Sequence, residues 1–176
     1  KQGTHSVGVA PQYCGALGKI ANCQQGVFAA YTSRKGYTFL DRRLYLPEDW
    51  FDDAHAPLRQ RYGVPPALRF QTEPQLALDM LHGLVERSVV PFLWVVADEH
   101  YGRIPAFLDG VAAEGKWYFA EVPASTKVWV GKPKIESPGA GPMGRPRTHP
   151  RVVAGEPHAA EVRQIAARLP ARAWRR

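Results

Sequence analysis

The chain has 176 residues, of which 45% are hydrophobic and 22% charged, and its formal net charge is +7. This length is enough for one domain with a core of its own, or for one domain and an appendage. No apolar run approaches the roughly 20 residues needed to span a bilayer, and the first residues lack the apolar stretch of a signal peptide. We therefore expect no membrane partner and a cytoplasmic location, with Cys14 and Cys23 as reduced thiols rather than a disulfide. Because the chain begins at Lys1 rather than Met, we also expect a segment upstream of it.

Basic residues are concentrated in the last third of the chain. Residues 127–176 contain 11 Lys/Arg and 3 Asp/Glu, a balance of +8, so the remaining 12 basic and 13 acidic residues balance at −1. Such asymmetry is typical of contact with a polyanion, most simply nucleic acid, but a solvated basic tail has the same composition. The composition is compatible with both interpretations, nucleic-acid contact and a solvated tail.

The first half of the chain predicts an antiparallel hairpin. Glycines make residues 15–22 a loop or wide turn, and residues 23–32 and 37–46 are rich in β-formers. Residues 33–36 lie between them as a turn. Residues 48–66 form an acidic, proline-broken surface segment with a short helix near its end.

Two helices and two strands follow. Thr72 is a predicted N-cap for a helix that runs to Arg87, with apolar residues at helical spacing. Residues 92–97 form an unbroken apolar run, which predicts a strand buried on both faces. A helix over residues 104–114 and a strand over residues 117–122 come next. The helical apolar positions are Leu76, Met80, Leu81, Leu84, Val85, Phe107, Leu108 and Val111.

The last part of the chain differs in kind. Residues 127–130 form a short strand, and residues 131–157 are dense in Pro, Gly and basic residues, which indicates a linker or flexible arm. An amphipathic helix is expected over residues 158–169. We expect two domains, a core over residues 1–130 and a basic segment over residues 131–176. The order β-β-α-β-α-β predicts an α/β fold with a mixed sheet and is that of a ribonuclease H-like fold without its opening strand, although other α/β folds share it.

Asp98 is the first polar residue beyond the apolar run at residues 92–97, in the sequence Asp-Glu-His-Tyr-Gly. Ligands of open α/β sheets bind beyond the carboxyl ends of the strands, and Mg²⁺ prefers carboxylate oxygens, so Asp98 is a candidate metal ligand and catalytic residue. A turn or capping role is the alternative. Before Asp98, the only acid in a predicted strand is Asp41, which lies in mid-strand, so a partner carboxylate is expected from a strand upstream of Lys1.

Other motifs carry less weight. The Gly-rich sequence at residues 139–144 matches a dinucleotide fingerprint in letter, but no apolar strand precedes it and Pro142 interrupts it. A third hypothesis is a doubly wound enzyme that acts on a small molecule, but the sequence contains no phosphate-binding loop to support it.

Five segments, in order along nearly the whole chain, resemble bacterial insertion-sequence transposases of the DDE superfamily endonuclease type. They are residues 1–15 (KQGTHSVGVAPQYCG), 45–50 (YLPEDW), 96–102 (VADEHYG), 122–129 (VPASTKVW) and 144–146 (GRP). The resemblance implies a ribonuclease H-like domain in which Asp, Asp and Glu hold two Mg²⁺ ions, and which cuts DNA at transposon ends and joins them to target DNA. The resemblance also implies that the protein is associated with the nucleoid.

Only one of the three acids, Asp98, maps onto this chain. The chain is thus expected to be an internal fragment, with the first Asp upstream and the Glu downstream, and to have no nuclease activity alone. DNA contacts are expected from Lys127, Arg145, Arg147 and Arg151, on charge and flanking flexibility, and dimerisation on DNA is left open. The alternative function is a non-catalytic nucleic-acid-binding module that uses the basic C-terminal third.

Overall fold

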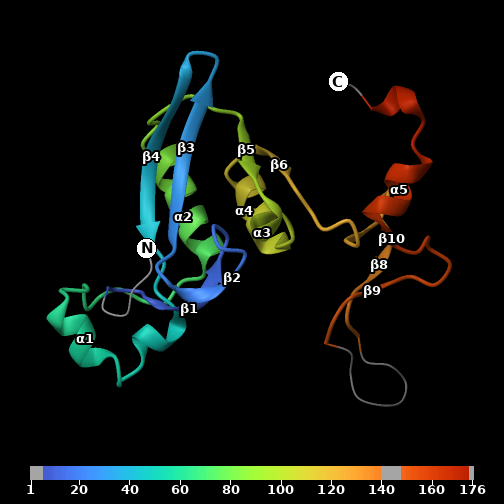
Figure 1. Cartoon of the computed structure of the whole chain (residues 1–176). Coiled ribbons are helices and arrows are strands. Elements are labelled where there is room, and N and C mark those ends of the chain that lie inside the picture. Colours follow the sequence, from blue (N-terminus) through green and yellow to red (C-terminus); the bar gives the residue numbers. More distant parts are fainter. Residues whose placement is uncertain (1–5, 140–147, 175–176) are drawn as a thin grey trace. The chain divides into compact units, whose positions relative to one another are not determined.

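The computed structural model describes residues 6–139 and 148–174, and it divides into two compact units, Lys1–Ala120 and Glu121–Arg176 (Figure 1). Each unit is considered by itself. In chain order, the first unit contains β1 (Ala10–Cys14), β2 (Lys19–Cys23), β3 (Gly26–Ser33), β4 (Gly36–Leu44), the 3-10 helix η1 (Glu48–Phe51), α1 (Ala56–Arg61), α2 (Glu73–Glu86), β5 (Trp94–Ala97), α3 (Glu99–Gly102), α4 (Pro105–Ala113) and β6 (Trp117–Ala120).

The first strands form a hairpin that the sequence did not predict. β1 and β2 pair antiparallel, from Ala10 opposite Cys23 to Cys14 opposite Lys19. The glycines of this region mark a tight turn, with Gly18 at φ +62°, rather than a long loop. The prediction of a loop or wide turn is therefore confirmed for residues 15–18 and wrong for residues 19–22, which belong to β2. Both cysteines are free thiols, as expected.

The predicted hairpin of β3 and β4 is confirmed. The strands pair antiparallel from Gly26 opposite Leu44 to Ser33 opposite Gly36, with a register shift between Ala29 and Ala30. β-Branched and aromatic residues make up half of β3 and occupy positions 37–39 of β4, and Gly36 at φ +137° allows the tight turn between the strands.

The parallel part of the fold is also as predicted. Thr72 begins α2 with a capping box, in which Thr72 and Gln75 satisfy each other's backbone amides. β5 and β6 then pair in parallel, from Trp94 opposite Trp117 to Ala97 opposite Ala120, with α4 as part of the crossover. β3–β4 and β5–β6 are separate two-stranded sheets among the described residues, and α2 and α4 lie behind them in the view of Figure 1.

The core of the first unit lies between these helices and the inner faces of the strands. One cluster joins Val27 of β3 to Leu76 and Met80 of α2. A second joins Leu81 of α2 to two residues of α4. Apolar side chains at helical spacing therefore form the core as the sequence predicted. The most deeply buried residues are Met80 (1% exposed) and Val111 (0%).

The outer face of β5 and β6 is exposed, which corrects the prediction that residues 92–97 are buried on both faces. Trp94 is 58% exposed and Val96 72%, and their neighbours Trp117 and Phe119 on β6 are 67% and 66% exposed. The helices of this unit cover only the opposite face of the strands. An unbroken apolar run therefore marks two apolar faces here, of which only one is covered.

The second unit is small, and none of its described residues is buried. β7 (Lys127–Val128) pairs antiparallel with β10 (Ala160–Glu161), and β8 (Ile135–Glu136) with β9 (Arg151–Val152). The arm expected over residues 131–157 thus contains a short strand pair. The last helix, α5 (Val162–Arg168), begins four residues later than predicted, and η2 (Ala171–Ala173) follows. No helix in the described ranges is both long and apolar enough to cross a bilayer.

Candidate functional site

Asp98 lies directly after β5, where the strand passes into α3. Its backbone is extended, with φ −79° and ψ −176°, and its Oδ1 accepts a hydrogen bond from the backbone N–H of His100 at 3.0 Å. The carboxylate is therefore the N-cap of α3, which is the capping role that the sequence left open. A carboxylate has a second oxygen, and Asp98 is exposed, so the cap leaves one oxygen for another ligand.

A second carboxylate reaches the same turn from α2. Glu73 Oε2 lies 2.6 Å from His100 Nε2, and the Glu73 side chain is 18% exposed. His100 thus contacts two carboxylates, Asp98 through its backbone and Glu73 through its ring. This pair could not be predicted from the sequence, in which Glu73 is only an acid in the first turn of a predicted helix.

Tyr101 anchors this turn in the core. Its ring lies 5.2 Å from that of Phe107, and it packs against the clusters around both Val27 and Leu81. Burial, followed by the negative charges of Glu73 and Asp98, raises the pKa of Tyr101 to about 12. The phenol therefore stays neutral at pH values at which an exposed tyrosine ionises.

β3 and β5, the two strands that end or begin near the turn at Asp98, run in opposite directions. Val27 near the start of β3 packs with Leu76 in the first turn of α2, and Glu73 at the start of α2 pairs with His100 just after β5. The start of β3 and the end of β5 therefore lie at the same end of the unit, as Figure 1 shows.

A slot of about 360 Å³ separates β3 from β5. Each of these strands pairs on one side only, β3 with β4 and β5 with β6, so the edges that face the slot lack strand partners among the residues described. α2 contributes apolar side chains, and Asp98 and Tyr101 lie at one end. The slot is lined by residues 27–32, Leu40, Ala77, Met80, Leu81, Leu84, Phe92, residues 94–98, Tyr101 and Phe107.

The donor set at Asp98 suits one position of a Mg²⁺ site, because that ion takes one or two carboxylates and keeps water and phosphate oxygens as its other ligands. Within residues 6–139 and 148–174, no three His, Cys, Asp or Glu side chains come together as a metal-binding group. Asp41 does not assist: it lies in β4, where Arg43 pairs with its Oδ1 at 2.6 Å. Burial raises the pKa of Asp41, but hydrogen bonds from the Arg42 amide and the Arg43 side chain lower it by more.

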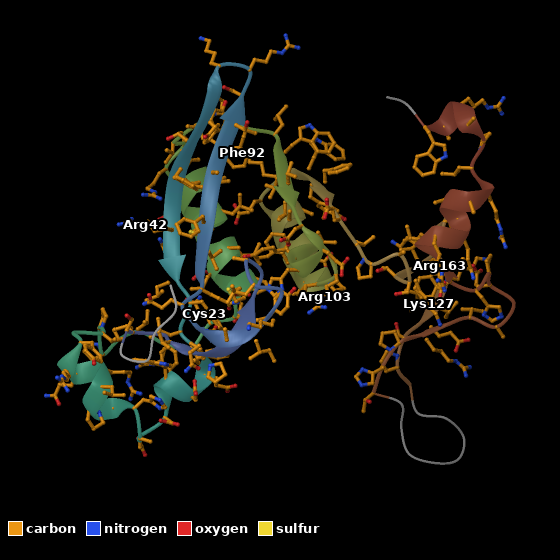
Figure 2. The ribbon with its side chains drawn as sticks, in the orientation of Figure 1. Cys23, Arg42, Phe92, Arg103, Lys127 and Arg163 are labelled. Atoms are coloured by element: carbon orange, nitrogen blue, oxygen red, sulfur yellow. The ribbon has the colours of Figure 1, made fainter. Side chains whose placement is uncertain are left out.

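The residues expected to contact DNA lie in the second unit. Lys127 is exposed in β7, near Arg163, as Figure 2 shows. Arg151 in β9 is also exposed, but its Nε pairs with Glu136 Oε2 at 2.8 Å. Arg145 and Arg147 lie outside the described residues. Lys127 is therefore the expected contact with the freer side chain.

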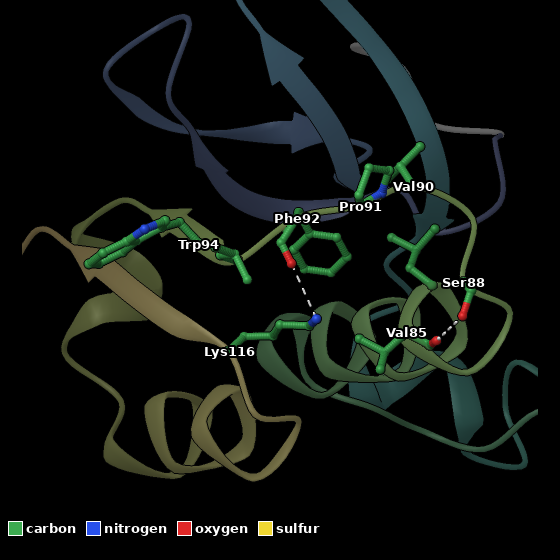
Figure 3. Close-up of a pocket in the computed structure, with 9 residues that line it drawn as sticks. Val85, Ser88, Val90, Pro91, Phe92, Trp94 and Lys116 are labelled. Carbon is green, nitrogen blue, oxygen red and sulfur yellow. Dashed lines mark hydrogen bonds between the residues drawn. The ribbon is translucent and has the colours of Figure 1, made fainter.

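A separate cavity of about 750 Å³ lies at the other end of β5, around residues 84–94 (Figure 3). Lys116 Nζ donates a hydrogen bond to the Phe92 carbonyl at 3.2 Å and lies 4.6 Å from the centre of the Phe92 ring. These contacts stabilise the entry into β5. No carboxylate lines this cavity, so it does not extend the site at Asp98.

The family model described as DDE superfamily endonuclease matches residues 1–176. No curated protein and no solved structure matches the chain.

Proposed function

The chain belongs to the DDE superfamily endonuclease family, which comprises transposase-type nucleases that act on DNA, and from this we propose that it is part of an insertion-sequence transposase. The parent enzyme would cut DNA at the transposon ends and join them to target DNA. The observation that carries the proposal is the match over all 176 residues, with Asp98 at the carboxyl end of a parallel strand.

A strand in the slot would complete a ribonuclease H-like sheet. It would run parallel to β5 and antiparallel to β3, and so join the two sheets into one of five strands, in the order β4, β3, added strand, β5, β6. Its last residues would emerge beside the start of β3. Val7 lies there, because its carbonyl accepts a hydrogen bond from Gln24 Nε2 at 2.6 Å, so the segment just before Lys1 is suited to supply the strand.

Asp98 is proposed as the catalytic acid and metal ligand that this chain contributes. When bound, Mg²⁺ would activate the attacking oxygen and stabilise the leaving oxygen of the phosphoryl transfer. Asp98 would hold the ion with the oxygen that does not cap α3, and Tyr101 would keep the turn seated on the core. The other two acids would come from outside these 176 residues, so the chain alone would be inactive.

The test compares the full reading frame with the 176-residue chain on DNA that carries the transposon ends, in Mg²⁺ or Mn²⁺. The full protein should cleave the ends, Asp98→Asn should abolish cleavage, and Asp109→Asn, an exposed acid of α4, should not. Cleavage that survives Asp98→Asn would overturn the role of Asp98. Nicking by the 176-residue chain that Asp98→Ala abolishes would overturn its proposed inactivity.

A second candidate function is non-catalytic binding of nucleic acid by the basic C-terminal third. It is favoured by the charge balance of +8 over residues 127–176 and by the exposed Lys127, Lys132 and Lys134. Binding through phosphates alone would weaken steeply with salt and would not respond to Mg²⁺, and Lys127→Gln would reduce the salt slope by about 1. Binding that requires Mg²⁺ and Asp98 would favour the first proposal.

A further inference from the structure

Glu73 is placed to control the turn that carries Asp98. Its carboxylate holds the His100 ring at 2.6 Å, and the backbone N–H of the same His100 donates to Asp98 Oδ1 at 3.0 Å. One residue therefore connects the two carboxylates. A shift of His100 would change which direction the Asp98 carboxylate faces, because the amide that fixes Oδ1 would move with it.

The Glu73 side chain is not required for the helix on which it lies. The first turn of α2 is capped by Thr72 and Gln75, which satisfy each other's backbone amides. Glu73 is nevertheless more buried than a typical carboxylate, at 18% exposed, while its partner His100 is 46% exposed. The pair also joins two elements distant in the sequence, the start of α2 and the first turn of α3.

We propose that Glu73 is a positioning residue for metal binding at Asp98, acting through His100. This inference rests on the proposed function, in which Asp98 is a metal ligand. Groups that orient a ligand without touching the metal commonly alter its affinity about tenfold or more when they are removed. Glu73 would thus hold the first turn of α3 in place. The oxygen of Asp98 that does not cap the helix would then face the end of the slot.

The experiment measures Mn²⁺ binding to the 176-residue chain by NMR, because paramagnetic broadening detects weak sites and needs no catalysis. Amides around Asp98 should broaden as Mn²⁺ is added, and Asp98→Ala should abolish the effect. Glu73→Ala should weaken the apparent affinity about tenfold or more. Glu73→Gln keeps an oxygen acceptor for the ring N–H and should lose less. Glu99→Ala removes a neighbouring exposed carboxylate of the same turn and should have little effect.

Each result has a distinct meaning. Broadening that is absent, or unaffected by Asp98→Ala, would overturn metal binding by this chain at Asp98 and therefore the positioning role, whereas the proposed function is tested by cleavage with the full reading frame. Broadening that needs Asp98 but is unchanged in Glu73→Ala would overturn only the positioning role. Equal losses in Glu73→Gln and Glu73→Ala would show that charge or direct ligation matters rather than the hydrogen bond, which also overturns it. Thermal unfolding of each variant must match the parent, so that a loss of fold is not read as a loss of affinity.

Discussion

The ring of His82 lies 2.8 Å from the carboxylate of Glu114, which joins the exposed side of α2 to the residue that ends α4. The hydrogen bond to Glu114 and the charge of Glu114 raise the pKa of His82 above its usual value. Because the folded-state pKa is raised, the stabilisation is fully present below about pH 6.5 and is lost as the pH rises through the folded-state value. Glu114→Gln should lower the pKa of His82 in an NMR titration, whereas Asp109→Asn should leave it unchanged.

Tyr101 should make the protein sensitive to alkali. Its pKa of about 12 exceeds the usual value of 10, so the neutral phenol is favoured in the folded state. The contribution of this pKa difference to the free energy of unfolding should be fully present below about pH 10 and be lost as the pH approaches 12. This contribution is at most about 2–3 kcal/mol. Absorbance at the tyrosinate band and denaturant unfolding at several pH values measure both effects. An unchanged pH dependence in Tyr101→Phe would contradict this assignment.

Met80 tests the core between α2 and β3. Its side chain is 1% exposed and packs with Val27 and Leu76. Met80→Ala should lower the free energy of unfolding by about 2–5 kcal/mol, from the lost burial and the cavity left behind. Glu86→Ala, at an exposed position of the same helix, is the matched control and should change it by less than about 0.5 kcal/mol.

Two glycines should respond to alanine in opposite directions. Gly83 lies inside α2, where a Cβ would meet Arg87 at an ordinary 3.5 Å, so Gly83→Ala should stabilise the protein by about 0.4–1 kcal/mol. Gly8 has φ +74°, and a Cβ there would lie 2.8 Å from the Tyr45 carbonyl oxygen. Gly8→Ala should therefore destabilise it by more than about 1 kcal/mol. Thermal unfolding of both variants gives the signs directly.

Hydrogen exchange can test the slot. Amides of β3 and β5 that face the slot should exchange faster than amides in the β3–β4 and β5–β6 ladders, because they lack strand partners in the described structure. A protein that includes the segment before Lys1 should protect them. Equal exchange in the two proteins would argue against a strand from that segment.

Local signals in the sequence predicted much of this fold. Thr72 and the apolar spacing of Leu76, Met80 and Leu84 located α2, and the unbroken run before Asp98 located β5. The paired strands of the first hairpin were missed because glycines in a tight turn resemble those of a loop. The pairing of Glu73 with His100 could not be predicted, because it depends on how two helix starts meet in space.

The exposure of Trp94 and Val96 was missed for a related reason. Hydrophobicity along a strand reports which side chains can be buried, but not whether another element covers them. The position of Asp98 at a strand end was predictable, whereas its second role as a helix cap required the geometry of the turn.

The slot between β3 and β5 has a consequence for how the complete sheet would form. A single strand entering it would bond both edges, and once one edge has fixed its backbone the second ladder forms with little further loss of chain entropy. Closure would therefore be cooperative, so that partly closed sheets are sparsely populated. Since Asp98 lies at the end of this slot, the acid expected on the added strand would reach Asp98 in the same step in which the sheet closes. A chain in which this strand is absent or unpaired would then lack that pair of acids.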